Sequence, residues 1–118
     1  MIDSHCHLTY LELASQIPAV LQRAAAAGVR ECVTIATDID DARKALDLSA
    51  QFPNVHVVCG IHPHQAGKAA EGWDTALHAL VRREDVHAVG EMGLDYHYDF
   101  SDRAAQHRVF TRQLEIAA

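Results

Sequence analysis

The alternation of strand and helix is clearest in ECVTIATDIDDARKALDLSAQFPNVHVVCGI, residues 31–61. Its first part, 31–36, is rich in the apolar and β-branched residues that are typical of a buried strand. Asp40 is placed to cap a helix over about 41–52, which Pro53 ends, and 55–61 is again strand-like. This order predicts two parallel strands joined by a right-handed helical crossover.

The same alternation extends toward both termini. Residues 3–8 are expected to form a strand, and 18–27 an alanine-rich helix that Gly28 follows. Farther along, 73–83 has the apolar spacing of a helix, and 86–91 is a fourth hydrophobic strand. The sequence therefore predicts four βα units in one parallel sheet.

A last helix is expected after Ser101, which can cap it. Its expected inner stripe comprises Ala105, Val109, Phe110, Leu114 and Ala117. The longest irregular stretch is expected at 62–72, after the third strand, where α/β proteins place their sites.

The extent of the chain leaves two architectures open. Four βα units are about half of a ~250-residue (β/α)8 barrel, or TIM barrel. They can also form a complete flavodoxin-like open sheet, in which the strand order would be 2-1-3-4. Residues 114–118 contain no Gly, Asn or Pro that would end a helix, so we expect 1–118 to be the N-terminal half of a barrel domain, cut within a helix. The open edges and inner face of such a half-barrel are expected to make it self-associate.

Composition and charge exclude several classes of protein. The 118 residues are 49% hydrophobic and 22% charged, as in ordinary globular proteins. A net charge of −6 argues against a broad basic surface for nucleic acid, but it does not exclude an enzyme that holds phosphate at a local metal site.

No apolar run is long enough to cross a membrane, and no secretory signal is expected at the N-terminus. Cys6, Cys32 and Cys59 lie in apolar runs, which indicates reduced thiols and a cytoplasmic protein.

The first chemical cluster lies on the first predicted strand. Side chains two residues apart on a strand point to the same face, so His5 and His7 project together and Asp3 lies one step behind them. Two imidazoles on one side of a strand can bind one metal ion. The alternative is a pair of histidines on a polar strand face.

The next two clusters follow the third and fourth strands. His62 and His64 lie at the mouth of a loop because Pro63 ends the strand pairing, and they either contact a metal-bound substrate or serve as turn residues. Glu91 ends a hydrophobic strand, where a carboxylate is expected to be buried and paired, protonated or metal-bound. Asp95 either orients a ligand histidine or caps the loop. The sequence has no nucleotide-binding glycine motif and no nucleophile motif of a catalytic triad.

At these residues the sequence resembles the TatD family of metal-dependent hydrolases, which are described as TatD-related deoxyribonucleases. The segments that carry the resemblance are, in order along the chain, DSHCHL at 3–8, AAGV at 26–29, GIHPH at 60–64, AVGEMGLDY at 88–96 and QLEIA at 113–117. The opening motif alone would fit much of the amidohydrolase superfamily, whereas the set of motifs is more specific.

The resemblance implies a TIM barrel with a site at the carboxyl ends of its strands and two divalent ions, such as Zn, Mn or Mg. It implies that His5 and His7 bind one ion and that Glu91 bridges both and is catalytic. The family's remaining ligands, two histidines and an aspartate on later strands, have no counterpart in these 118 residues. The implied reaction is hydrolysis by metal-activated water, and the implied substrates are nucleic acids, chiefly DNA, or aminoacylated tRNA.

Two other functions compete with a nuclease. One is an amidohydrolase that acts on C–N or ester bonds. A lysine at the end of the fourth strand would favour that function, but Glu91 occupies this position and favours a nuclease. The other is a non-catalytic, metal-binding half-barrel that serves as an assembly module. For the 118-residue chain alone we expect little or no hydrolysis.

Overall fold

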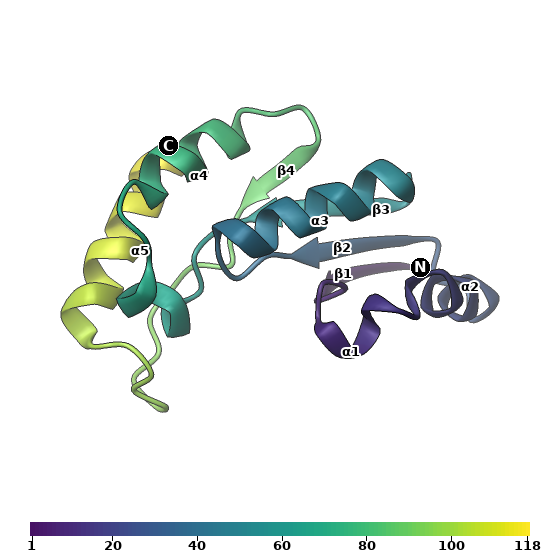
Figure 1. Ribbon diagram of the computed structural model, residues 1–118, viewed down its shortest axis with the longest axis horizontal. Helices are drawn as coiled ribbons and strands as arrows, with labels where there is room; N and C mark the ends of the chain where they lie inside the picture. Colours follow the sequence, from purple (N-terminus) through teal and green to yellow (C-terminus); the bar gives the residue numbers. More distant parts are fainter.

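The computed structural model describes all residues, 1–118, and contains one parallel sheet. Its strands are β1 (Ile2–Cys6), β2 (Glu31–Ile35), β3 (Val55–Cys59) and β4 (Val86–Val89). They lie in the order β1-β2-β3-β4, and all three neighbouring pairs are parallel (Figure 1). This confirms the order predicted for a barrel segment and excludes the flavodoxin-like order.

The helices follow the strands as expected, with two additions. They are α1 (Leu11–Ala14), α2 (Ile17–Ala26), α3 (Ile39–Gln51), the 3-10 helix η1 (Pro63–Lys68), α4 (Trp73–Val81) and α5 (Arg103–Ala117). The short η1 lies in the stretch 62–72 that was expected to be irregular, and α1 lies between the first predicted strand and the first predicted helix. In Figure 1, α3 and α4 run along the same side of the sheet, and α5 lies beside α4 at the end toward which β2 and β4 point.

Two helix caps differ from the prediction. The side chain of Asp38, not that of Asp40, accepts a hydrogen bond from Asp41 N–H at the start of α3. At the start of α5 the cap is Asp102, whose carboxylate accepts from Ala105 N–H. Ser101 is instead buried between η1 and α5, where its hydroxyl has other partners.

The main core lies between the sheet and the helices that cover it. It joins β3 to α3 and α4 through Val57, Cys59, Ala45 and Leu77, all of which are fully buried. A second cluster joins β1 and β2 to α2. Because strand side chains alternate, the other face of the sheet carries the less buried residues and forms an open inner face.

The buried stripe of α5 is more polar than predicted. Its buried residues are Ala105, Gln106, Val109 and Gln113. Leu114, which was expected on the inner stripe, is 46% exposed. Gln106 and Gln113 are buried where the backbones of two loops pack against α5, and their amides provide hydrogen-bond partners for those backbones.

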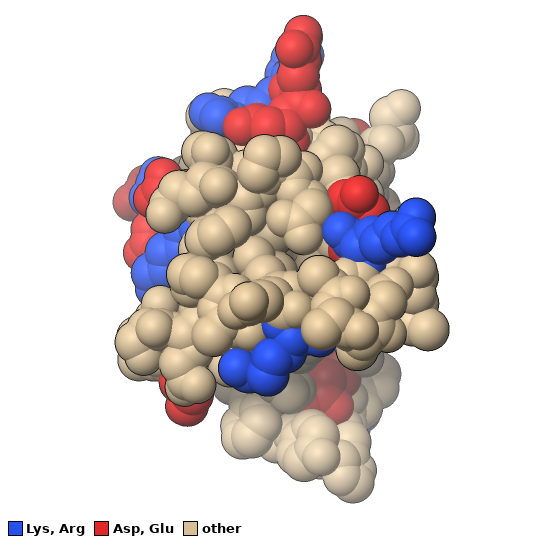
Figure 2. All heavy atoms as spheres, turned by 90° about the vertical axis from the view of Figure 1, so that its right-hand side faces the viewer, with Lys and Arg blue, Asp and Glu red and all other residues tan.

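The face of the molecule in Figure 2 has no broad band of basic side chains. On the face in Figure 2, Lys and Arg side chains lie in small groups interrupted by Asp, Glu and uncharged residues. No helix is both long enough and apolar enough to span a bilayer.

Candidate metal centre

Three of the predicted metal ligands converge at the carboxyl edge of the sheet. One ligand atom from each of His5, His7 and Glu91 lies within 4.8 Å of the other two. His5 Nε2 is 3.4 Å from Glu91 Oε2. His5 and His7 come from the end of β1 and Glu91 from the end of β4, the two outermost strands. The curvature of the sheet therefore brings together residues that a flat sheet would separate.

His7 is held in one orientation by two contacts. Its Nδ1 lies 2.9 Å from the carbonyl oxygen of Ile35, and because a carbonyl can only accept, Nδ1 carries the proton. The ring of Tyr10 stacks on that of His7, with the centroids 5.1 Å apart and the planes within 5°. The neutral tautomer thus leaves Nε2 as a free electron-pair donor, which is the state that binds a metal ion.

The Asp3 carboxylate makes no hydrogen bond with either imidazole ring. Its Oδ1 accepts a hydrogen bond from the backbone N–H of His5 at 3.2 Å. Strand β1 ends at Cys6, and its pairing with β2 shifts register between Asp3 and Cys6. His7 therefore lies just beyond the strand that was expected to include it, and Asp3 supports the backbone of a candidate ligand.

Glu91 is placed by close packing of two glycines. A Cβ on Gly60 would lie 2.4 Å from the carbonyl carbon of Gly90, so only glycine lets the ends of β3 and β4 approach this closely. Gly90 N–H also donates to the Cys59 carbonyl oxygen at 2.8 Å. The Glu91 side chain is 35% exposed rather than buried, because it lies on the open inner face.

His62 extends the site toward the third strand. Its Nε2 is 3.9 Å from Glu91 Oε1, and its Nδ1 accepts a hydrogen bond from His64 N–H. Burial lowers the pKa of His62, although the charge of Glu91 opposes that effect. In the resulting neutral ring Nδ1 is the acceptor, so Nε2 carries the proton and can donate toward Glu91 or a bound anion.

His64 and Asp95 form a pair beside the centre. His64 Nε2 lies 2.6 Å from Asp95 Oδ2. The other oxygen, Oδ1, accepts from the backbone N–H groups of His97 and Tyr98, at 2.9 and 3.3 Å. The N–H of His97 is the main cause of the lowered pKa of Asp95, and His64 adds to it. Asp95 thus organises its own loop and orients His64, a histidine that is not among the three candidate ligands.

Two buried glutamines that sequence reasoning missed hold the loops of this site. The amide of Gln106 accepts from Asp95 N–H at 2.6 Å and donates to the carbonyl oxygens of Asp95 and Ser101. Gln113 makes the equivalent pair of bonds with Ile61, the residue before His62. The available signal was spacing, because Gln106 and Gln113 are seven residues apart on the face that carries the apolar Val109.

Ser101 links the two loops to each other. Its hydroxyl donates to the His64 carbonyl oxygen and accepts from Gly67 N–H, both at 2.9 Å. The start of α5 is therefore fixed to η1, and the loop that carries Asp95 cannot move independently of the one that carries His64.

The donor set fits a divalent cation. Two imidazole nitrogens and a carboxylate oxygen are ligands for zinc and manganese, and three protein ligands leave coordination positions for water or substrate. A carboxylate can also be shared between two cations through its two oxygens. The arrangement is thus suited to bind a cation and, beside it, an anionic substrate.

Comparisons with known proteins agree with the fold and point to one family. The model of a family described as TatD related DNase matches residues 2–118. A protein of Salmonella typhimurium named 3'-5' ssDNA/RNA exonuclease TatD is 36% identical over the whole chain, which covers 45% of that protein. A protein of Dickeya dadantii with the same name is 38% identical, again with 45% of it covered. The crystal structure of YJJV, a TatD homolog from Escherichia coli K12, superimposes with a TM-score of 0.91 at 31% identity, over 99% of this chain and 46% of that one. The chain thus spans a little under half the length of the relatives it matches.

Proposed function

The chain belongs to the TatD-related DNase family, and on this basis we propose that it supplies half of the active site of a divalent-metal-dependent hydrolase that cuts phosphodiester bonds in nucleic acid. The observation that carries the proposal is the convergence of His5, His7 and Glu91 from the two outer strands. The names of the Salmonella and Dickeya relatives support a single-stranded nucleic acid as the substrate class. Within that class, we propose DNA as the main substrate.

The domain proposal follows from the same comparisons. We propose that residues 1–118 are the N-terminal half of a single barrel domain, since they match about 45% of the relatives. The other half would close the inner face and add ligands from later strands. The 118 residues alone are then expected to associate through their open edges and to show little or no hydrolysis, which light scattering and an activity assay test.

Each residue of the centre has a proposed task. His5 and the Nε2 of His7 would hold one divalent ion, and Glu91 would bind it and bridge to a second. When bound by these residues, a divalent ion would supply a lowered pKa for its bound water, from ~16 toward ~7, and positive charge to offset that of the phosphate. The Nε2–H of His62, which lies 3.9 Å from an oxygen of the same carboxylate, would donate to a phosphate oxygen.

His64 and Asp95 complete the proposed substrate side. The carboxylate of Asp95 fixes the ring of His64 next to His62, whose ring centroid is 4.4 Å away. His64 would thus contact the substrate beside the scissile phosphate. The three free cysteines, two of them buried, fit a protein of the reducing cytoplasm.

The decisive experiment uses the full-length protein that contains these residues and a 3′-labelled single-stranded DNA. We expect release of label with a divalent metal, loss of activity with a chelator and recovery when metal is restored. Replacement of His7 by Ala should lower the rate at least about a hundredfold. His78→Ala, which removes an exposed histidine of α4, is the matched control and should keep full activity. Chelator-resistant hydrolysis would refute the proposal.

A further inference from the structure

A row of rings leads from the candidate metal centre to the surface. His62 lies beside Glu91, and the ring of His64 packs edge-on against that of His62 with the centroids 4.4 Å apart. The ring of Phe100 packs edge-on against His64 at 4.8 Å, and Tyr98 follows at 5.5 Å from Phe100. The outermost rings are therefore continuous with the centre.

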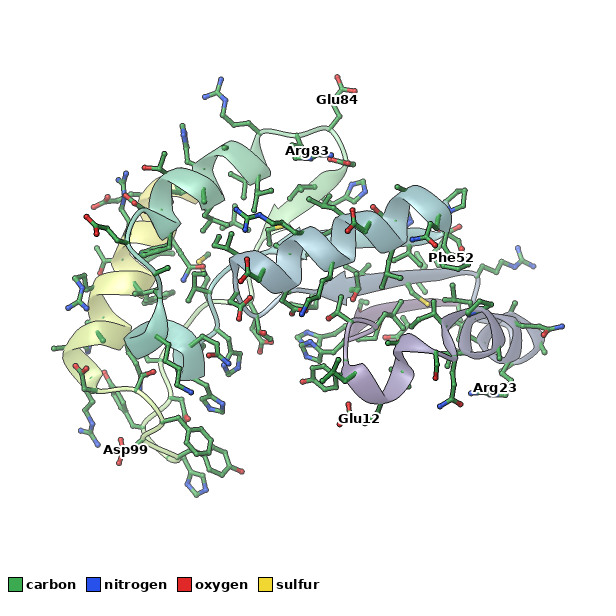
Figure 3. The ribbon with its side chains drawn as sticks, viewed as in Figure 1. Glu12, Arg23, Phe52, Arg83, Glu84 and Asp99 are labelled. Atoms are coloured by element: carbon green, nitrogen blue, oxygen red, sulfur yellow. The ribbon has the colours of Figure 1, made fainter.

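The two outer rings form what we call the aromatic platform, Tyr98 and Phe100. Their planes are within 3° of parallel, and the residues are 61% and 63% exposed. Asp99 between them has a φ of 53°, a left-handed conformation that aspartate tolerates better than most residues. Figure 3 shows the loop that carries Asp99 projecting from the body of the molecule.

The platform is held in place from beneath. His64, fixed by Asp95, packs edge-on against both rings. The backbone N–H of Tyr98 donates to the same carboxylate, and Gln106 binds the backbone of Asp95 from α5. Two large aromatic side chains are thus packed against a fixed histidine and still remain largely exposed, so their ring faces are available for binding.

We propose that the aromatic platform binds unpaired nucleobases of the nucleic-acid strand whose phosphodiester is held at Glu91; this inference rests on the proposed function. Flat, exposed rings stack on any base, and such stacking is tolerant of sequence. Bases of a duplex are already stacked on their neighbours, so the platform would favour single strands.

The charges around the platform favour contact with bases rather than with the backbone. In the sequence, Asp99 lies between the two rings and Asp102 follows Phe100 by two residues, and carboxylates repel phosphates. The nearby cation, Arg103, lies over the ring of Tyr96 at 4.4 Å from its centroid. Recognition at Tyr98 and Phe100 would therefore come from the ring faces.

The test pairs enzyme variants with modified substrates. In the full-length protein with Mn²⁺, kcat/KM is measured on 5′-labelled oligothymidylates in which one abasic residue is moved stepwise from the 3′ end. For the unmodified protein, we expect about a tenfold loss at one or two positions. The double variant Tyr98→Ala/Phe100→Ala should lose about tenfold on the complete oligonucleotide and should be insensitive to the abasic residue.

Three controls make the result specific. Tyr98→Phe retains the ring and should retain the rate, and Leu114→Ala, which removes an exposed apolar side chain of α5, should change nothing. Bis(p-nitrophenyl) phosphate carries no base, so its hydrolysis should be equal in all variants.

The outcomes separate the two proposals. If the unmodified protein hydrolyses neither substrate, both the proposed function and the platform are refuted. If it hydrolyses both and the double variant matches it on every oligonucleotide, the platform alone is refuted. An equal loss on the oligonucleotide and on bis(p-nitrophenyl) phosphate would also refute it, because the rings would then be structural.

Discussion

The side-chain amide of Gln113 satisfies both polar groups of the Ile61 backbone. Its Oε1 accepts from Ile61 N–H at 2.7 Å, and its Nε2 donates to the Ile61 carbonyl oxygen at 3.0 Å. Both residues are buried, and they are 52 positions apart in the chain. Helix α5 therefore fixes the segment that leads into His62.

Replacing Gln113 by Leu should destabilise the protein by about 2–4 kcal/mol, because two buried backbone groups lose their partners. Chemical denaturation of the two proteins measures the difference. Gln51→Leu is the matched control, since this exposed glutamine at the end of α3 binds only a carbonyl of its own helix, and it should change stability by less than about 0.5 kcal/mol. Equal stability of the two variants would show that the Gln113 bonds contribute nothing.

The contact between Gly60 and Gly90 predicts a specific effect of one methyl group. Gly60→Ala places a Cβ 2.4 Å from a backbone atom that cannot move aside cheaply, so the ends of β3 and β4 must separate. We expect a loss of about 1–3 kcal/mol of stability and a displaced Glu91 that lowers metal affinity. A Cβ on Gly93 meets nothing within 4 Å, so Gly93→Ala should leave both unchanged. Calorimetric metal titration of both variants decides the matter, and normal affinity in Gly60→Ala would contradict this account.

The cysteines should be unreactive in the folded protein. Burial raises the pKa of Cys6 to about 12 and that of Cys59 to about 11, and it also raises the pKa of Cys32. Because the folded state disfavours the thiolate, stability should be unaffected below about pH 9 and should fall as the pH rises further. A thiol reagent at pH 8 should label three thiols after unfolding and almost none before. Rapid native labelling of any of them would overturn this prediction.

Asp95 should contribute stability that depends on pH. Hydrogen bonds from His97 N–H, Tyr98 N–H and His64 lower its pKa, so its charged form is favoured by folding. The stabilisation of the folded state by Asp95 should be complete above about pH 4, the pKa of this carboxyl in the unfolded chain. It should be lost as the pH falls through the lower pKa that Asp95 has in the folded protein. Thermal unfolding of Asp95→Asn between pH 2 and 6 should therefore differ from the unmodified protein only at the higher pH values.

Much of the fold could be predicted from the sequence because each strand is a short apolar run bounded by clear helix signals. The order of the four strands followed from the βα pattern, whereas the grouping of His5, His7 and Glu91 in one site was what the resemblance to the TatD family implied. The caps at Asp38 and Asp102 were missed by one or two residues, since neighbouring acidic and hydroxyl residues offer similar signals.

The support of the site could not be predicted in the same way. Apolar periodicity assigns buried positions to apolar residues, so Leu114 was chosen and Gln113 was not. A glutamine side chain is stable in the interior only when its amide is hydrogen-bonded. The partners of Gln106 and Gln113 are loop backbones, and the sequence alone does not place these loops beside α5.

The catalytic role of the metal centre is tested by measuring metal content and hydrolysis rate in the same samples of the full-length protein. Mass spectrometry of bound metal and release of a labelled nucleotide from single-stranded DNA are followed during chelation and after metal is restored. We predict that bound metal and rate fall and recover together in the unmodified protein, and that Glu91→Gln keeps its fold but loses at least about a hundredfold in rate at saturating metal. Full hydrolysis by protein with less than about one tenth of a metal ion per chain, or by Glu91→Gln, would contradict the claim that His5, His7 and Glu91 form a catalytic metal centre.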